Sequence, residues 1–276
     1  MEKLQTLTGE ELTGSLGRYA KTVFTYEVWP QYLSVSANFH TFSLANTLLL
    51  CAQKPDALYV GGYHWWRDEF GRHVRKGEKA IRLVFPEYGE DCWRTASVFD
   101  VSQTAGARMP SFLTRRFMTS LKDDPLFLQS LLLASPVPVR FEETTAGVAG
   151  FYRPLDQEII IRQGMPAEET IRVLLYEIAS ALVHQEHSGD SRQDRIRREI
   201  ETAGIAGIVS RRFMLSADPS RFRHIGLWAK DQSPADLTGT LETIRCAADK
   251  LIRLICAVRD PQAESSYPEP LSLIAA

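Results

Sequence analysis

Apolar residues recur at helical spacing, at every third or fourth position, in five long stretches of the chain. The stretches are residues 8–25, about 30–53, 167–187, 192–215 and about 235–258. Pro30, Pro166 and Pro234 stand at or just before the start of three of them, where proline suits a helix because its missing N–H would have no partner there. Residues 111–133 are also helical in composition, with Pro125 dividing them.

Short apolar runs separated by glycine lie between these helices. The runs that we expect to form strands are residues 58–63, 81–85, 93–100, 137–141 and 158–162. N-terminal helices with a small antiparallel sheet, followed by a mostly helical part with a short sheet, predict an α+β fold. We expect a domain at residues 1–104, a linker at 105–122, a second domain at 123–262 and a loose tail at 263–276.

Charge and cysteine content limit the classes of function. The 276 residues carry a formal net charge of −2, so any nucleic acid must bind at a local basic patch. The four cysteines form no CxxC pair, which favours reduced thiols over a disulfide framework or a zinc knuckle. There is no apolar signal segment and no stretch near the roughly 18 apolar residues of a membrane span, so we expect a cytoplasmic protein with no membrane partner.

Residues 63–79, YHWWRDEFGRHVRKGEK, place aromatic side chains just before a cationic cluster. The aromatic residues are Tyr63, Trp65 and Trp66, and the cationic residues are Arg72, Arg75, Lys76 and Lys79. This combination suits an unpaired nucleic-acid strand, because bases stack on aromatic rings at roughly 1–3 kcal/mol each and cations follow the phosphates. The alternative is a hairpin with a buried tryptophan and a solvated basic face.

Two amide side chains upstream are further candidates for the same interface. Asn46 and Gln53 are seven residues apart, so they lie on nearly the same face of the expected helix. Their amides could meet a base or a nucleic-acid backbone. Alternatively, they are ordinary surface amides, or they tie down a neighbouring loop.

Residues 32–104 contain an ordered set of short motifs. The motifs are FHTFS at 39–43, NTLLL at 46–50, QKPDA at 53–57, the segment at 61–66, GRHVRKGEK at 71–79 and VFDVSQT at 98–104. In this order and spacing they resemble the N-terminal single-stranded-DNA-binding domain of the ArdC-type antirestriction family, which includes the LtrC-like proteins of conjugative elements. The resemblance implies single-stranded DNA as a partner, with Gly71, Gly77 and Asp100 shaping turns and one tryptophan in the core.

The same resemblance implies a C-terminal zincin-like metallopeptidase domain, with an HExxH helix and a later glutamate ligand. In HExxH the two histidines bind zinc and the glutamate activates the metal-bound water. Here the corresponding segment reads YEIAS, so Tyr176 and Ser180 replace the histidines, Glu177 remains as a vestige, and Glu199 stands at the third ligand position. We therefore expect a degenerate, inactive site without a metal cofactor.

Other residues of the second half allow two alternatives. His184, His187 and Glu199 could make a displaced zinc site, although their order matches neither HExxH nor its inverse. A run of arginines could extend a strand-binding path, or it could be a solvated helix face paired with nearby carboxylates. These arginines are Arg192, Arg195, Arg197, Arg198, Arg211 and Arg212.

The sequence thus favours a single-stranded-DNA-binding protein of a mobile genetic element. It would act in antirestriction or protect the strand during conjugation, with a pseudoenzyme domain as scaffold and possible contact with a host restriction or defence protein. A second hypothesis is a zinc metallopeptidase that cleaves a repressor or defence protein. A third is a non-catalytic interaction module that inhibits a host defence complex.

Overall fold

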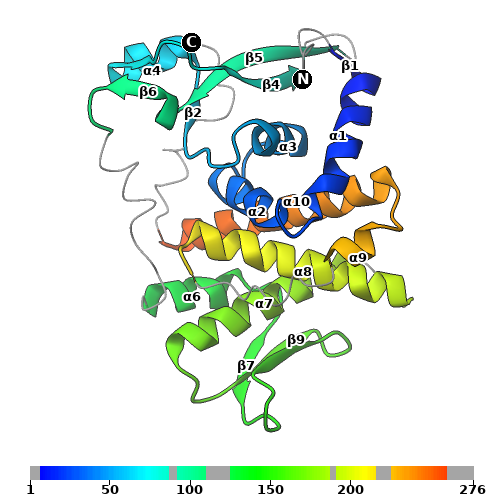
Figure 1. Ribbon diagram of the computed structural model, residues 1–276. Coiled ribbons are helices and arrows are strands. Elements are labelled where there is room, and N and C mark those ends of the chain that lie inside the picture. The colour runs from blue at the N-terminus through cyan, green and yellow to red at the C-terminus, as the bar shows by residue number, and fades with distance from the viewer. Residues whose placement is uncertain (1–6, 87–91, 110–124, 187–190, 216–224, 260–276) are drawn as a thin grey trace. The chain divides into compact units, whose positions relative to one another are not determined.

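The computed structural model describes residues 7–86, 92–109, 125–186, 191–215 and 225–259. Within these ranges the chain divides into two compact units. The first unit holds the described residues up to 109 together with 229–239, and the second holds 125–228 and 240–259. The expected linker and tail lie largely or wholly outside the described residues. Figure 1 shows the helices and strands of both units.

The N-terminal part of the chain forms three helices where two were expected. They are α1 (Gly9–Val23), α2 (Trp29–Asn38) and α3 (Leu44–Gln53). Ser43 caps α3, because its side chain accepts a hydrogen bond from the N–H of Asn46. The prediction of one helix over residues 30–53 was therefore wrong, because buried residues such as Phe39 and Phe42 continue the apolar pattern through the break.

Helix α3 is central to the first unit. It packs against α1, α2 and strand β4 (Ile81–Pro86), as Figure 1 shows. The core beside it contains Trp29, whose ring stacks on Phe24 at a centroid distance of 5.3 Å. Tyr32 completes this aromatic cluster and is fully buried.

Strand β5 (Cys92–Asp100) organises the sheet of the first unit. It pairs antiparallel with β4, and β1 (Leu7–Thr8) and β2 (Val60–Gly61) pair with its two ends. Strands β3 (Arg72–Val74) and β6 (Thr104–Gly106) form a separate antiparallel ladder. The 3₁₀ helix η1 (Val101–Gln103) joins β5 to β6. The predicted small antiparallel sheet is confirmed.

The segment expected as a strand at 58–63 differs from the prediction. Only Val60 and Gly61 pair as strand, and Tyr63–Phe70 forms helix α4. Gly71 ends this helix in the left-handed region, at φ 59°, which glycine adopts without steric cost. Aromatic residues favour strands on average, so the short aromatic run gave no helical signal of its own.

From residue 125 onwards the described chain is mostly helical with one short sheet. Its helices are α6 (Pro125–Ala134), α7 (Ala167–Glu186), α8 (Arg192–Arg212), α9 (Ile225–Ala229) and α10 (Pro234–Arg259). Strand β9 (Glu158–Arg162) lies between β7 (Val139–Glu142), to which it is parallel, and β8 (Gly150–Arg153), to which it is antiparallel. The α+β fold class is confirmed, although β8 was not predicted.

Helix α7 joins the layers of the second unit. One side of it packs on β8 and β9, and it also packs against α8. The strand approaches the helix so closely at Gly150 that an added Cβ would lie 2.7 Å from Cγ1 of Val173. None of the described helices is long and apolar enough to cross a membrane.

Candidate nucleic-acid interface

Helix α4 places its two neighbouring tryptophans in different environments. Trp66 is fully buried, and its Nε1 donates a hydrogen bond of 2.9 Å to the carbonyl oxygen of Phe99 in β5. Its ring also lies against Phe70, with the centroids 5.7 Å apart. Trp66 therefore anchors α4 to the sheet, and it is the tryptophan that belongs to the core.

Trp65 and Tyr63 are placed differently on the same helix. Trp65 is half-buried, lies across the ring of Phe70 at 4.6 Å, and covers Gly61, where an added Cβ would be 2.1 Å from Cε3 of the indole. Tyr63 is 48% exposed and meets His64 edge to face at 5.6 Å. Of the three predicted aromatic residues, one is therefore available at the surface and one is available in part.

The first of the four predicted cations has a structural role. In β3 the Arg72 guanidinium donates from Nε to Oγ1 of Thr104 at 2.8 Å, from Nη2 to the Thr104 carbonyl at 3.1 Å, and from Nη1 to the carbonyl oxygen of Ala107. These bonds tie β3 to β6 and to the residue after it. These bonds use three of the five N–H donors of Arg72 and fix its guanidinium on the β3–β6 ladder.

The other three cations lie in the basic turn, which we define as residues Arg75–Lys79. Arg75 forms an ion pair of 2.7 Å with Glu78 and donates to the Ser102 carbonyl at 2.6 Å. Hydrogen bonds from the Arg75 guanidinium, and then from a neighbouring amide, hold the pKa of the Glu78 carboxyl below its ordinary value. Lys76 and Lys79 are exposed, and neither forms an ion pair within the described residues.

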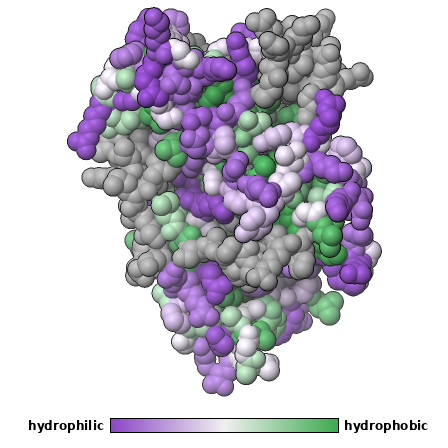
Figure 2. All heavy atoms as spheres, viewed as in Figure 1, coloured by the Kyte–Doolittle hydropathy of each residue, from purple (hydrophilic) through white to green (hydrophobic). Residues whose placement is uncertain are grey.

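Figure 2 shows that hydrophilic residues predominate on the visible face where α4 and β6 lie in Figure 1. Helix α4 packs against β3, which leads directly into the basic turn.

The turn bends at Gly77, where φ is 89° and an added Cβ would meet nothing within 4 Å. The backbone conformation, and not a lack of space, therefore accounts for the glycine.

The amides of Asn46 and Gln53 serve the sheet. Asn46 accepts from the N–H of Val84 at 2.8 Å and donates to its carbonyl at 2.9 Å. Gln53 makes the same pair of bonds with Arg82, both at 2.9 Å. The two amides satisfy alternate residues along the edge of β4 that does not pair with β5. Of the three roles considered for them, the structure therefore gives them the last, tying down a neighbouring segment.

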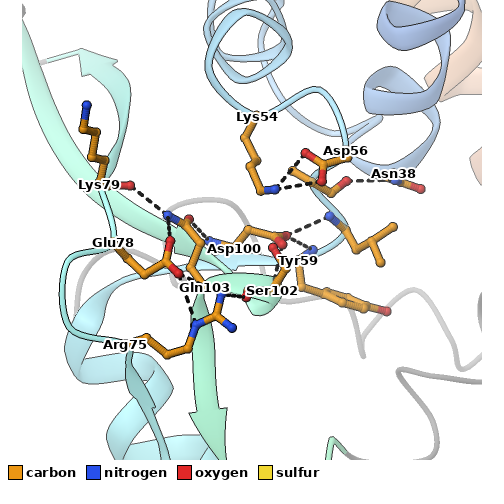
Figure 3. Close-up of polar contacts among 12 residues, drawn as sticks. Asn38, Lys54, Asp56, Tyr59, Arg75, Glu78, Lys79, Asp100, Ser102 and Gln103 are labelled. Atoms are coloured by element: carbon orange, nitrogen blue, oxygen red, sulfur yellow. Dashed lines mark hydrogen bonds and ion pairs between the residues drawn. The ribbon is translucent and has the colours of Figure 1, made fainter.

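Two residues outside the candidate set, Asp100 and Gln103, order the chain around η1, and Figure 3 shows their contacts. The buried carboxylate of Asp100 accepts from the N–H groups of Leu58 at 2.8 Å, Tyr59 at 3.0 Å and Ser102 at 2.8 Å. The side-chain oxygen of Gln103 accepts from the N–H of Asp100 at 2.8 Å. This reciprocal capping box has the D-x-x-Q spacing that could have identified it in the sequence.

The residues expected at a degenerate peptidase site lie mostly on α7. The carboxylate of Glu177 accepts a hydrogen bond of 2.8 Å from the N–H of Tyr152 in β8. Nδ1 of His184 lies 2.9 Å from the Ser180 carbonyl oxygen, and its ring is 5.4 Å from that of Tyr152. Burial raises the pKa of the Tyr152 hydroxyl.

These positions do not supply a zincin donor set. Tyr176 and Ser180 are poor zinc ligands at neutral pH, Glu199 is exposed on α8, and His187 lies outside the described residues. In the part of the chain that the structure describes, no group of three or more His, Cys, Asp or Glu side chains could hold a metal ion. The displaced site of His184, His187 and Glu199 stays a hypothesis.

The arginine run of α8 is partly internal. Arg197 forms an ion pair of 2.8 Å with Glu201, which is fully buried, and Arg198 and Arg212 are also buried. Burial lowers the pKa of Arg211. The run is therefore not one continuous exposed basic face.

Comparison with known proteins finds a domain match and a likeness of fold. Residues 23–114 match the family model of the N-terminal domain of anti-restriction factor ArdC. No curated protein matches the sequence. Among solved structures, the Mn(II)-bound antirestriction ArdC protein from the R388 plasmid is similar, with a TM-score of 0.55 and 16% identity over 76% of this chain and 84% of that one. Its metal-free structure gives 0.55 and 18% over 77% and 84%. The chain is thus similar in fold to the ArdC protein, and its residues 23–114 match the N-terminal domain of anti-restriction factor ArdC.

Proposed function

We propose that this chain is an antirestriction protein of the ArdC type that binds single-stranded DNA through its N-terminal domain. The contact surface would combine the exposed ring of Tyr63, part of Trp65, and the basic turn. The observation that carries the proposal is that the matched family domain presents Lys76 and Lys79 without ion-pair partners among the described residues, on a turn that follows the aromatic helix.

Physical chemistry supports a single strand as the ligand. An unpaired base can stack on an exposed aromatic ring, at roughly 1–3 kcal/mol per base, and this needs no particular sequence. The two lysines would contact phosphates, while the net charge of −2 over the whole chain argues against general attraction to duplex DNA. A host restriction or defence protein as a second partner is part of the same proposal.

The second unit would act as a scaffold or as a partner surface. A zincin-type step needs the histidine ligands that positions 176 and 180 lack. The Mn(II) in the solved relative belongs to that protein, and nothing in the donor chemistry of Tyr176, Glu177 and Ser180 calls for the same ion here.

The test is a fluorescence-anisotropy titration of the full chain with a labelled oligonucleotide of mixed sequence, in single-stranded and duplex form, at several salt concentrations. Lys76→Ala should weaken binding and reduce the log–log salt slope by about 0.7, the value for one phosphate of a single strand that is no longer neutralised. Lys250→Ala is the matched control, because Lys250 is an exposed lysine on α10 with no ion pair in the described residues.

The two variants remove the same charge, so a general electrostatic effect would appear in both. A wild-type protein with no preference for the single strand over the duplex would refute the proposal. Equal salt slopes for Lys76→Ala and Lys250→Ala would refute the assignment of the surface. Antirestriction itself would be tested by the survival of unmodified DNA in cells that carry a restriction system, with and without the protein.

A further inference from the structure

One buried residue, Gln103, holds both ends of the basic turn, the start through its main-chain carbonyl and the end through its side-chain amide. At the start of the turn, the N–H of Arg75 donates to the carbonyl oxygen of Gln103 at 3.0 Å. At its end, Nε2 of Gln103 donates to the carbonyl oxygen of Lys79 at 2.8 Å and to the Glu78 carboxylate at 3.2 Å. Gln103 therefore bridges the two ends of a five-residue turn whose two lysines are exposed (Figure 3).

Gln103 is itself fixed. Its side-chain oxygen accepts from the N–H of Asp100, and the side chain is only 7% exposed. Both the oxygen and the nitrogen of the amide are therefore occupied, and the residue has almost no surface with which to touch a DNA strand. Asp100 in turn accepts hydrogen bonds from the backbone just before β2 and from the start of η1. Gln103 is thus bonded to the end of β5, the strand to which Trp66 attaches α4.

The role of Gln103 rests on the function proposed above. We infer that Gln103 is a positioning residue for single-stranded DNA binding: it holds the basic turn in its binding conformation without contacting the DNA. A turn that is already ordered spares the loss of conformational freedom that a mobile turn would suffer on binding. Glu78 assists by pairing with Arg75, whose guanidinium also donates to the Ser102 carbonyl and is thereby held within the turn.

This role leaves a signature that differs from that of a residue in direct contact with the strand. Removing a phosphate contact reduces both the affinity and the salt slope. Removing a positioning residue reduces the affinity but leaves the number of phosphate contacts, and hence the slope, unchanged. A reduction of general stability changes neither in a protein that remains folded.

The experiment compares Gln103→Met with the wild type in the same anisotropy titration, using the full chain and the single-stranded oligonucleotide. Methionine is close in volume and neutral, so it removes the amide bonds without adding charge. We expect affinity to fall by about tenfold, the order expected when one loop must be ordered on binding, with an unchanged salt slope. Hydrogen exchange at the Asp100 amide, which donates to the Gln103 side chain, should become faster in the variant.

Asn38→Leu is the matched control. The Asn38 amide donates to the Ala57 carbonyl at 3.0 Å, so this substitution also breaks a tie between a side chain and a backbone carbonyl, but not one in the turn. It should leave the affinity unchanged at a temperature where the protein is folded.

Each result decides between the two proposals. If the wild type binds and Gln103→Met binds equally well, or if its salt slope falls as that of Lys76→Ala does, the positioning role is refuted while the proposed function stands. If the wild type does not bind the oligonucleotide at all, the proposed function is refuted, and the role of Gln103 with it.

Discussion

Replacing Asn46 tests most directly whether the amides of α3 belong to the fold or to the DNA interface. The side chain is buried and makes two bonds to Val84, a residue 38 positions further along the chain. Asn46→Leu would leave both the N–H and the carbonyl of Val84 buried and unpaired. Each such group costs about 1–3 kcal/mol, so together they amount to roughly 2–6 kcal/mol. Partial packing of leucine into the same space favours the lower half of that range.

The assay is urea unfolding of the full chain, followed by tryptophan fluorescence. Four of the five tryptophans belong to the first unit, so this signal reports mainly on the unit that contains Asn46. Gln31→Leu serves as the control, because Gln31 is an exposed amide on the neighbouring helix α2 with no hydrogen-bond partner among the described residues. It should shift the midpoint little.

DNA binding supplies the second half of this test. Below the unfolding transition, Asn46→Leu should bind the single-stranded oligonucleotide as the wild type does, because its amide faces β4 and not solvent. An unchanged unfolding midpoint would refute the structural role. Failure of the folded variant to bind DNA would restore Asn46 to the interface.

Three further predictions concern the other candidate residues. Trp66→Ala should lower the free energy of unfolding by about 3–5 kcal/mol, because its indole is fully buried. Tyr63→Ala should leave the free energy of unfolding unchanged and weaken DNA binding. The reverse pattern in the urea and anisotropy assays would contradict the placement of the two rings. The lowered pKa of Glu78 stabilises the folded state above the ordinary glutamate pKa of 4.5, and this stabilisation should be lost as the pH falls through the lower folded-state pKa. Glu78→Gln should remove this pH dependence. Equal melting temperatures of the wild type and Glu78→Gln at every pH from about 3 to 7, around the ordinary glutamate pKa, would contradict this prediction. Protein dialysed after exposure to zinc should retain less than one equivalent by metal analysis, and a full equivalent that disappears in His184→Ala would revive the displaced site.

The sequence predicted most of the helical elements because helix periodicity is a local property. The stretches at 167–187, 192–215 and 235–258 correspond closely to α7, α8 and α10. The errors lie where local preference and tertiary packing disagree, at the break before α3 and at α4. In both places a cap or a glycine, and not the apolar pattern, sets the boundary.

The candidate site was only partly predictable. Composition and spacing brought Tyr63, Lys76 and Lys79 to attention, and the ordered motifs indicated the resemblance to the ArdC N-terminal domain that residues 23–114 match. Gln103 escaped notice as a site residue because its importance comes from hydrogen bonds to residues 24 and 25 positions away. Only the D-x-x-Q capping spacing signalled it locally.

The sequence alone determined the α+β class, the likeness of the N-terminal part to ArdC and the residue types at positions 176 and 180, because each of these depends on residue types in a fixed order. The tertiary structure decided which tryptophan is core, which amides hold β4, and which cations of the basic stretch remain without an ion-pair partner among the described residues. Those questions depend on hydrogen-bond partners that lie far along the chain. Trp66 and Trp65 are neighbours of the same type, and only the carbonyl of Phe99, 33 residues away, distinguishes the anchor from the partly exposed ring.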